Sequence, residues 1–303
     1  MSSAISTQPR MQARRGAQAI VLISVILPPI ALVTVMWLAW GSGFGLIDLA
    51  IFAGMYLACG LGITIGFHRY FTHKSFDCPR WVKIMLGVTG SMAVQGDLLW
   101  WCAVHRKHHQ HSDSHEDPHS PHVGRGGRMR RFLYSHFGWL FRIEDPDKSR
   151  YVPDLMADPD LRMISRLFPL WVFISMAIPT ILGGLLAGSW FGALTGFLWG
   201  GLVRVFFEHH VTWSVNSVCH IWGQQPYDSH DHSRNNALVG VLALGEGWHN
   251  NHHAFPTSAR HGLAWWQFDA SWLVIRLMSC VGMARNLKTP SRDRLARAGG
   301  ADD

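Results

Sequence analysis

The sequence predicts an all-α integral membrane protein with four transmembrane helices, arranged as two hairpins. Apolar residues make up 48% of the 303 residues and charged residues only 16%, against about 25% in soluble domains. Long runs with few or no charges occur in two pairs, each pair joined by a short turn. This composition excludes a disordered chain, a coiled coil and a disulfide-rich scaffold.

The first hairpin is predicted from two apolar runs near the N-terminus. Residues 17–40 carry no charge and follow a polar tail, 1–16, that contains three Arg residues. Residues 44–66 carry only Asp48. At about 1.5 Å per residue, runs of this length cross a hydrocarbon core of roughly 30 Å. The short linker makes the two helices neighbours.

The second hairpin is predicted much later in the chain, from residues 168–188 and 189–212. The first of these runs is uncharged, and the second carries only Arg204 and Glu208, near its end. Their i,i+4 spacing allows them to pair or to extend toward the membrane interface. We interpret both as structural anchors.

The 27 Lys and Arg residues predict the topology. All but Arg204 lie in the N-terminal tail, in 67–167 or after 212, and the hairpin turns contain none. The positive-inside rule therefore places both termini and the parts 67–167 and 213–285 in the cytoplasm, with 286–303 as a C-terminal tail. We expect a bacterial inner membrane. The charge needs no nucleic acid to explain it, since no recognition motif accompanies it.

Eight of the 19 histidines lie in three compact clusters. The clusters are H-R-Y-F-T-H with His68 and His73, H-R-K-H-H with His105, His108 and His109, and H-N-N-H-H with His249, His252 and His253. The i, i+3, i+4 spacing of the last two puts three imidazoles on one helical face. His68 and His73, five residues apart, suit a helix end that wraps a site.

These clusters predict a nitrogen-rich site for two metal ions. Imidazole binds Zn, Cu, Fe and Ni, and eight imidazoles exceed the needs of one ion. The zinc motif H-E-x-x-H occurs only at 115–119, where Pro118 opposes the helix that would carry it, and the four Glu residues are too few for a carboxylate-rich di-iron site. Glu116 with His119 and Glu246 with His249 match Glu-x-x-His, but Pro118 opposes a helix through the first pair. Iron is the metal suited to oxygen chemistry.

Ten of the eleven histidines outside the clusters are expected to be surface or hydrogen-bonding residues: His111, His115, His119, His122, His136, His209, His210, His230, His232 and His261. Two more apolar stretches, 84–104 and 264–282, contain polar residues such as Asp97 and Asp269. We interpret both as helices in the interface or in the cytoplasmic part. If 84–104 crossed the bilayer, His68 and His105 would lie on opposite sides.

The ordered motifs resemble the membrane fatty acid desaturases, of the stearoyl-CoA (acyl-CoA delta-9) type. The likeness covers roughly 44–285 and includes N-S-V-C-H at 216–220 and G-E-G-W-H-N-N-H-H-A-F-P at 245–256. It implies four transmembrane helices below a cytosolic cap that holds two irons. It also implies nine iron-binding histidines, the eight above and His220, and an Asn, here Asn216, that contacts one iron through water.

The same resemblance implies an acyl tunnel. Gln95, Trp101, Thr212 and Trp213 resemble residues at the kink where the chain is oxidised, and Trp139 resembles an aromatic at the tunnel mouth. Where animal members place polar or charged residues against the CoA headgroup, this chain has Gly96, Ala103, Val104 and Ile143. A phospholipid acyl chain or an acyl carrier protein therefore competes with CoA.

The implied reaction is O2-dependent cis desaturation near the middle of a long saturated acyl chain, at the delta-9 position. Side chains cannot remove hydrogen from an unactivated methylene, so a metal cofactor is required. Asp113, Asp117 or Asp231 could orient imidazoles from behind. No cytochrome b5 motif (H-P-G-G) or ferredoxin-like Cys set is present, so we expect a separate electron donor, a ferredoxin or cytochrome b5 type with its reductase.

Two alternatives remain open. A hydroxylase of alkanes or acyl chains would use the same irons, but the alkane-type motif N-Y-x-E-H-Y-G is absent. Alkene or alcohol as product would decide between them. A non-catalytic membrane metal transporter or sensor would need polar residues inside the spans, and these contain almost none. Metal uptake into vesicles would identify it.

Overall fold

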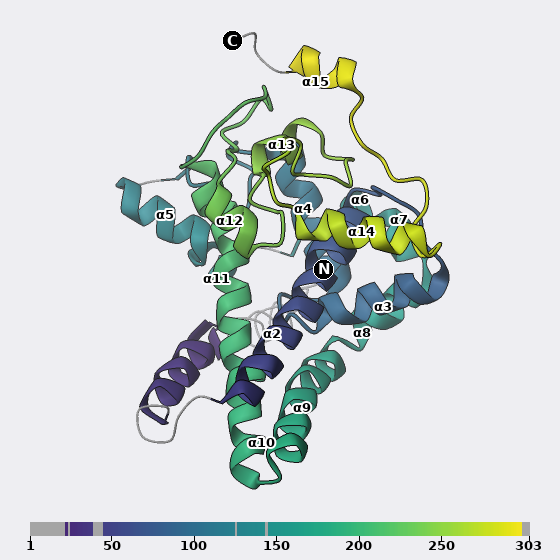
Figure 1. Cartoon of the computed structure of the whole chain (residues 1–303). Helices are drawn as coiled ribbons and strands as arrows, with labels where there is room; N and C mark the ends of the chain where they lie inside the picture. The colour runs from purple at the N-terminus through teal and green to yellow at the C-terminus, as the bar shows by residue number, and fades with distance from the viewer. Residues whose placement is uncertain (1–21, 24, 39–44, 125, 143–144, 299–303) are drawn as a thin grey trace, which may run out of the picture.

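The computed structural model describes residues 22–23, 25–38, 45–124, 126–142 and 145–298. Within these residues the regular structure is helical, and the only strand-like pairings are isolated bridges. The all-α prediction is therefore confirmed for the described chain. Figure 1 shows the long helices at one end of the molecule and a crowd of short helices and loops at the other.

After the N-terminal helix Val25–Leu38, the helices in chain order are α2 (Leu46–Leu61), η1 (Gly62–Thr72), α3 (Arg80–Ser91), α4 (Leu98–His111), α5 (Arg128–His136), η2 (Gly138–Phe141), α6 (Lys148–Tyr151), α7 (Pro153–Ala157), α8 (Pro159–Arg166), α9 (Phe168–Ala187), α10 (Trp190–Gly196), η3 (Phe197–Val203), α11 (Arg204–Ser217), η4 (Val218–His220), α12 (Ala237–Leu242), α13 (His249–Ala254), α14 (Ala270–Cys280) and α15 (Arg292–Ala298).

Three helices in the described residues are long and apolar enough to cross a membrane: Leu46–Thr72, Phe168–Ala187 and Trp190–His220. They coincide with the predicted runs 44–66, 168–188 and 189–212. Two of them continue further than the apolar runs do, because π-helical η1 extends α2 and because α11 and η4 carry the last helix to His220. Both extensions bring histidines out of the apolar region.

The remaining predicted span, 17–40, lies partly outside the described residues. Its described part contains the apolar helix Val25–Leu38, which is shorter than the other three. Ala31 and Val35 of this helix form a buried cluster with Leu198 and Val203, so it packs against η3. A fourth crossing is consistent with this packing and stays a prediction.

The hairpin between α9 and α10 depends on small residues. Gly188 ends α9 with a left-handed φ of 60°, and the Ser189 hydroxyl then caps α10 by accepting from the Gly192 N–H. The two helices approach so closely that a Cβ on Gly183 would lie 2.2 Å from the Gly192 carbonyl oxygen. Larger residues there would force the helices apart.

Neither of the two doubtful apolar stretches forms a long helix. The stretch 84–104 breaks between α3 and α4, and Asp97 caps the second helix by accepting from the Trp100 N–H. The stretch 264–282 contains α14, whose 11 residues reach only about 16 Å. Their interpretation as helices that do not span the bilayer agrees with this geometry.

The pair Arg204 and Glu208 was expected either to pair or to extend toward the interface. The structure decides for pairing. Arg204 Nη1 donates to Glu208 Oε2 at 2.9 Å, and both side chains are buried between helices. Because the alternative partner for such charges would be hydrocarbon, mutual pairing inside the bundle is the arrangement expected at this depth.

Candidate metal centre

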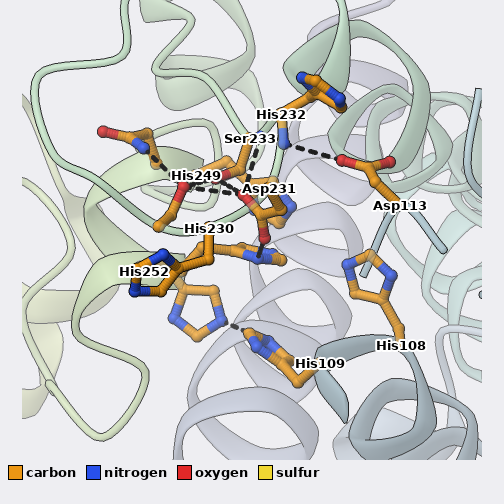
Figure 2. Close-up of polar contacts among 12 residues, drawn as sticks. His108, His109, Asp113, His230, Asp231, His232, Ser233, His249 and His252 are labelled. Carbon is orange, nitrogen blue, oxygen red and sulfur yellow. Dashed lines mark hydrogen bonds and ion pairs between the residues drawn. The ribbon is translucent and has the colours of Figure 1, made fainter. Parts of the chain in front are cut away.

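The nine histidines singled out from the sequence lie together in two adjacent groups. The first group contains His68, His73, His105, His109 and His252, and the second contains His108, His220, His249 and His253. Within each group, the atoms that could bind a metal all lie within 4.8 Å of one another. Figure 2 shows side chains from both groups converging on one region.

The spacing of histidines on α4 explains why there are two groups. His105 and His109 are four residues apart and share one helical direction, whereas His108 points to the neighbouring group. Each side of α4 therefore contributes to a different group.

α13 also contributes to both groups, but it gives two histidines to the second group and one to the first. His249 and His253 belong to the second group, and His252 belongs to the first. Two short helices thus supply six of the nine imidazoles and hold both groups side by side.

The long helices supply the remaining three imidazoles. His68 lies in the last turns of η1, and His73 follows directly after its end. His220 ends the helix Trp190–His220. Because the π-helical turn is wider than an α-turn, η1 reorients its residues relative to α2, and such turns are frequent at functional sites.

The ring nitrogens within the first group face one another. His252 Nε2 lies 3.0 Å from His68 Nε2 and 2.9 Å from His109 Nε2, and His109 Nε2 lies 3.1 Å from His105 Nε2. Two nitrogens bound to one ion at about 2.1 Å and about 90° would lie about 3 Å apart. The convergence of the Nε2 atoms is therefore suited to a shared metal ion.

Several imidazole nitrogens in the two groups are buried without a hydrogen-bond partner among the described residues. They include His73 Nε2, His108 Nε2 and His253 Nε2. Buried polar atoms in native proteins normally have partners, so atoms left free in a common space indicate a missing ligand. A metal ion would satisfy them, because neutral imidazole offers it a lone pair.

Burial also favours the neutral form of six of the nine imidazoles. Removal from water, reinforced by the neighbouring imidazoles, lowers the pKa well below the usual value for His73, His105, His109, His249 and His252. Burial likewise lowers the pKa of His253 to about 4, although Asp231 opposes the shift. These six imidazoles therefore need not lose a proton to bind a metal near neutral pH.

Three carboxylates orient imidazoles of the second group from behind. Asp117 accepts from His108 Nδ1 at 3.0 Å, Asp113 from His220 Nδ1 at 3.0 Å, and Asp231 from His253 Nδ1 at 2.5 Å. Figure 2 shows Asp113 joined to His232 and Asp231 joined to Ser233 in the same region. With the proton fixed on Nδ1, Nε2 is left as the metal-binding atom.

The carboxylates are themselves held in place. Burial alone would raise the pKa of the Asp117 carboxyl, but His108 and the His119 backbone N–H lower it far below its usual range. The Asp113 carboxylate accepts from Ser120 Oγ and from the His232 N–H. These groups remain charged acceptors for the imidazoles.

Sequence reasoning missed a fourth carboxylate of this kind, Glu246. Its Oε2 lies 2.5 Å from His68 Nδ1, and its Oε1 accepts from the buried Arg69. Arg69 is held in turn by Asp269. Glu246 was noted only for its spacing from His249, and nothing local in the sequence connects it with His68, 178 positions away.

His119 and His261, expected among surface or hydrogen-bonding histidines, are both buried. His261 Nδ1 lies 3.3 Å from Glu246 Oε2, and its ring packs 4.5 Å from that of His252. His119 packs 4.4 Å from His108. Both contact histidines of the two groups, and neither belongs to the group of five or to the group of four.

A cavity opens beside the histidine groups. Its lining includes His68, His105 and His249, together with Asn216. Most of its remaining wall is apolar and comes from α2, η1, α11 and the end of α12, including Ile63, Val211, Val215, Leu242 and Leu244. This mostly apolar lining suits an apolar chain that approaches the imidazoles.

Three of the five predicted substrate residues line this cavity, at its junction with the histidines. Gln95 Nε2 donates to Thr212 Oγ1 at 2.9 Å, and Trp101 Nε1 donates to Gln95 Oε1 at 3.4 Å. Gln95 thus joins the loop before α4 to α11. A hydrogen-bonded chain of this kind fixes the cavity wall at the site of chemistry.

The other two predicted substrate residues are not among the lining residues of this cavity. Trp139 is buried and stacks on Trp100 with ring centroids 6.3 Å apart. Trp213 is buried against His209 and His210, on the other side of α11 from Thr212. Their contact with substrate stays a prediction.

Comparison with known proteins now gives the family. Residues 46–278 match the family model of the fatty acid desaturases. The chain is 39% identical over 89% of its length to the hex-5-enoyl-[acyl-carrier protein] acetylenase of Moorena producens, of which it covers 86%. It is 38% identical over 93% of its length to the chloroplastic palmitoyl-monogalactosyldiacylglycerol delta-7 desaturase of Arabidopsis thaliana (71% covered). It is 42% identical over 76% of its length to the sn-1 stearoyl-lipid 9-desaturase of Anabaena variabilis (79% covered). The chain therefore belongs to the fatty acid desaturase family and is an oxidoreductase that acts on fatty acyl chains.

Proposed function

We propose that this protein is an O2-dependent di-iron desaturase that introduces a cis double bond, at or near delta-9, into a long saturated acyl chain. The observation that carries the proposal is an apolar cavity that ends on the first of two adjacent histidine groups. In the proposal, the nine histidines of these groups bind the two irons, and Asn216 contacts one of them through water.

Two bound irons would supply the O2 activation that breaking an unactivated C–H bond requires. The protein's own residues do the rest. Asp113, Asp117 and Asp231 hold a proton on Nδ1 of their histidines and so direct Nε2 inward. The hydrogen bond between Gln95 and Thr212 holds the wall that bends the acyl chain beside His105. The apolar wall excludes water from the reacting methylenes.

The length of the cavity supports a position near the middle of the chain. Its lining on α11 runs from Asn216 back to Glu208, eight residues or about 12 Å. An extended alkyl chain advances about 1.3 Å per carbon, given C–C bonds of about 1.5 Å. A lining of that length matches about nine carbons of an extended chain. The relatives named as 9-desaturases favour delta-9 over delta-7 and delta-5, which other relatives' names give.

The headgroup in this proposal is a lipid or a thioester carrier. The names of the relatives include acyl-lipid, acyl-CoA and acyl-carrier-protein substrates. Ala103 and Val104 stand at two of the positions where animal members place residues against the CoA headgroup. Both are buried here and cannot meet a headgroup at the surface. Ile143 lies outside the described residues. Electrons come from a separate ferredoxin-type or cytochrome b5-type protein.

The proposal includes a topology of four spans, with the histidine groups in a cytoplasmic cap. The apolar helix Val25–Leu38, packed on η3, supports a fourth crossing beside the three longer helices. All nine histidines lie at the same end of the long helices, which supports a single cap.

Expression in a host that lacks unsaturated fatty acids tests the proposal. We expect cis-monounsaturated acyl chains in the lipids of cells that express the protein, and none with His252→Ala. If the lipids contain hydroxylated acyl chains and no alkenes, the proposal of a desaturase is wrong and the hydroxylase alternative holds. Separation of lipid-bound, CoA-bound and carrier-bound acyl chains, shortly after labelling with saturated fatty acid, identifies the headgroup.

A further inference from the structure

A buried ion pair forms part of the cavity system, and the reaction described above does not use it. Arg204 is completely buried, and Glu208 is 4% exposed. Arg204 donates to the carbonyls of Gly200 and Met92 and to Ser175 Oγ, in addition to Glu208. The guanidinium therefore joins several elements and is well satisfied.

The Glu208 carboxylate has a hydrogen-bond partner for only one of its two oxygens among the described residues. Its Oε2 accepts from Arg204, but its Oε1 is buried and has no hydrogen-bond partner among the described residues. Glu208 lines the same cavity as His68 and His105. A buried carboxylate oxygen without a donor is costly, so a water molecule or a ligand is expected to meet it in this cavity.

The position of Glu208 places this oxygen far from the histidines. Glu208 precedes Asn216 by eight residues on α11, or about 12 Å. On the opposite wall Tyr56, which also lines the cavity, precedes His68 by twelve residues along α2 and η1. The Tyr56 hydroxyl donates to the Leu242 carbonyl at 2.7 Å, so its proton is already used. The cavity lining thus contains, about 12 Å along α11 from Asn216, a carboxylate whose Oε1 has no hydrogen-bond partner among the described residues.

We propose that Glu208 sets the longest acyl chain that the cavity accepts, by a polar stop and not by bulk. The inference rests on the proposed function, because it concerns the methyl end of the same acyl chain. A chain that ends short of Glu208 leaves room for water on Oε1. A longer chain pushes its methyl group against the carboxylate and removes that water.

The balance of two effects decides the length. Burial of one more methylene favours binding about fourfold. Loss of the hydrogen-bond partner of a buried acceptor disfavours binding by roughly 5- to 150-fold, and a charged acceptor lies toward the upper end. The second effect outweighs the first for the first methylene that reaches Glu208. The same argument predicts that a chain with a terminal hydroxyl group is accepted, because the hydroxyl donates to Oε1 in place of water.

The test uses the full-length protein with saturated acyl chains of increasing length, with and without a terminal hydroxyl group. The principal variant is Arg204→Met combined with Glu208→Met, because removal of both members of a buried ion pair avoids an unpaired charge. Glu208→Gln is the second variant, since it retains the shape of the side chain and removes only the charge. The matched control is Asp48→Asn, which makes the same chemical change at a residue of α2 outside the cavity lining.

We expect the double variant to raise the ratio of longer to preferred products roughly tenfold. Glu208→Gln should move the ratio less, in the same direction, and Asp48→Asn should leave it unchanged. The preference for a terminal hydroxyl over a methyl group should weaken in both Glu208 variants. If the double variant does not fold, Glu208→Gln and the hydroxylated chains decide.

If the wild type is active and the folded Glu208 variants keep its preferences for chain length and for a terminal hydroxyl group, the inference is overturned. The proposed function is then left intact. If the wild type contains iron and is supplied with a reduced electron donor but desaturates no acyl chain of any length, the proposed function itself is overturned.

Discussion

Replacement of Asp117 by Asn measures what a carboxylate behind a metal-binding imidazole contributes. The buried Asp117 oxygens lie 3.0 and 3.1 Å from His108 Nδ1 and also accept from the backbone N–H groups of Asp113 and His119. Asn has only one acceptor oxygen. Its amide NH2 must therefore face either the imidazole N–H or a backbone N–H, and one donor loses its partner.

The expected magnitude follows from the place of His108 in the second group. Loss of the partner behind a metal-bound imidazole typically lowers metal affinity 10- to 100-fold. This corresponds to about 1.4 to 2.7 kcal/mol of binding free energy. His108 belongs to the four-histidine group and not to the five-histidine group, so in the proposed di-iron state the loss should fall on one of the two ions. We expect Asp117→Asn to release about half of its iron at chelator concentrations that leave the wild type fully loaded.

The assay is metal analysis of the purified protein after dialysis against a series of chelator concentrations. Glu116→Gln is the matched control: it changes the neighbouring carboxylate, whose side chain is 66% exposed and pairs with His111, not with a member of either group. The control should match the wild type at every concentration. Equal iron retention by Asp117→Asn, the control and the wild type would refute the role assigned to Asp117.

Three further predictions concern the centre, the topology and the cavity. Purified protein should contain about two iron equivalents, and His252→Ala should lose most iron, because this Nε2 contacts two neighbours; a single zinc with activity surviving His252→Ala would contradict this. With the exposed Cys280 replaced by Ser, cysteines at the exposed Ser114 and Ser291 should be labelled from the same side of sealed vesicles, and opposite sides would exclude the four-span topology. Thr212→Trp should abolish turnover by filling the cavity while iron stays bound; loss of iron would assign Thr212 a structural role.

The long helices could be predicted because hydropathy and charge act locally. Residues 44–66, 168–188 and 189–212 need only be apolar and long enough, and all three correspond to such helices. The ends could not be predicted in the same way. The helix from α2 continues to Thr72 and the last one to His220, beyond the apolar runs, and hydropathy does not mark these ends. The burial of Arg204 depends on Ser175 and Met92, which only the folded structure brings close.

The histidine groups could be predicted for a similar reason, since i, i+3, i+4 spacing on one helix is visible in the sequence. His220 is different: it stands alone, and only the resemblance to a family singled it out. Glu246 and His261 could not be found, because their partners are distant along the chain. Such polar residues are buried because the helices and loops of the cap pack around them. Hydropathy alone predicts that polar residues are exposed.

The division of histidines between the two groups has a consequence for how the centre forms. α13 has only six residues and is far too short to be stable alone. It nevertheless supplies His249 and His253 to one group and His252 to the other. Its position therefore depends on contacts to both, including the bond from His253 to Asp231. In the proposed di-iron state, each ion would fix α13 for the other, so the two ions would bind cooperatively, and the coupling would pass through a single short helix.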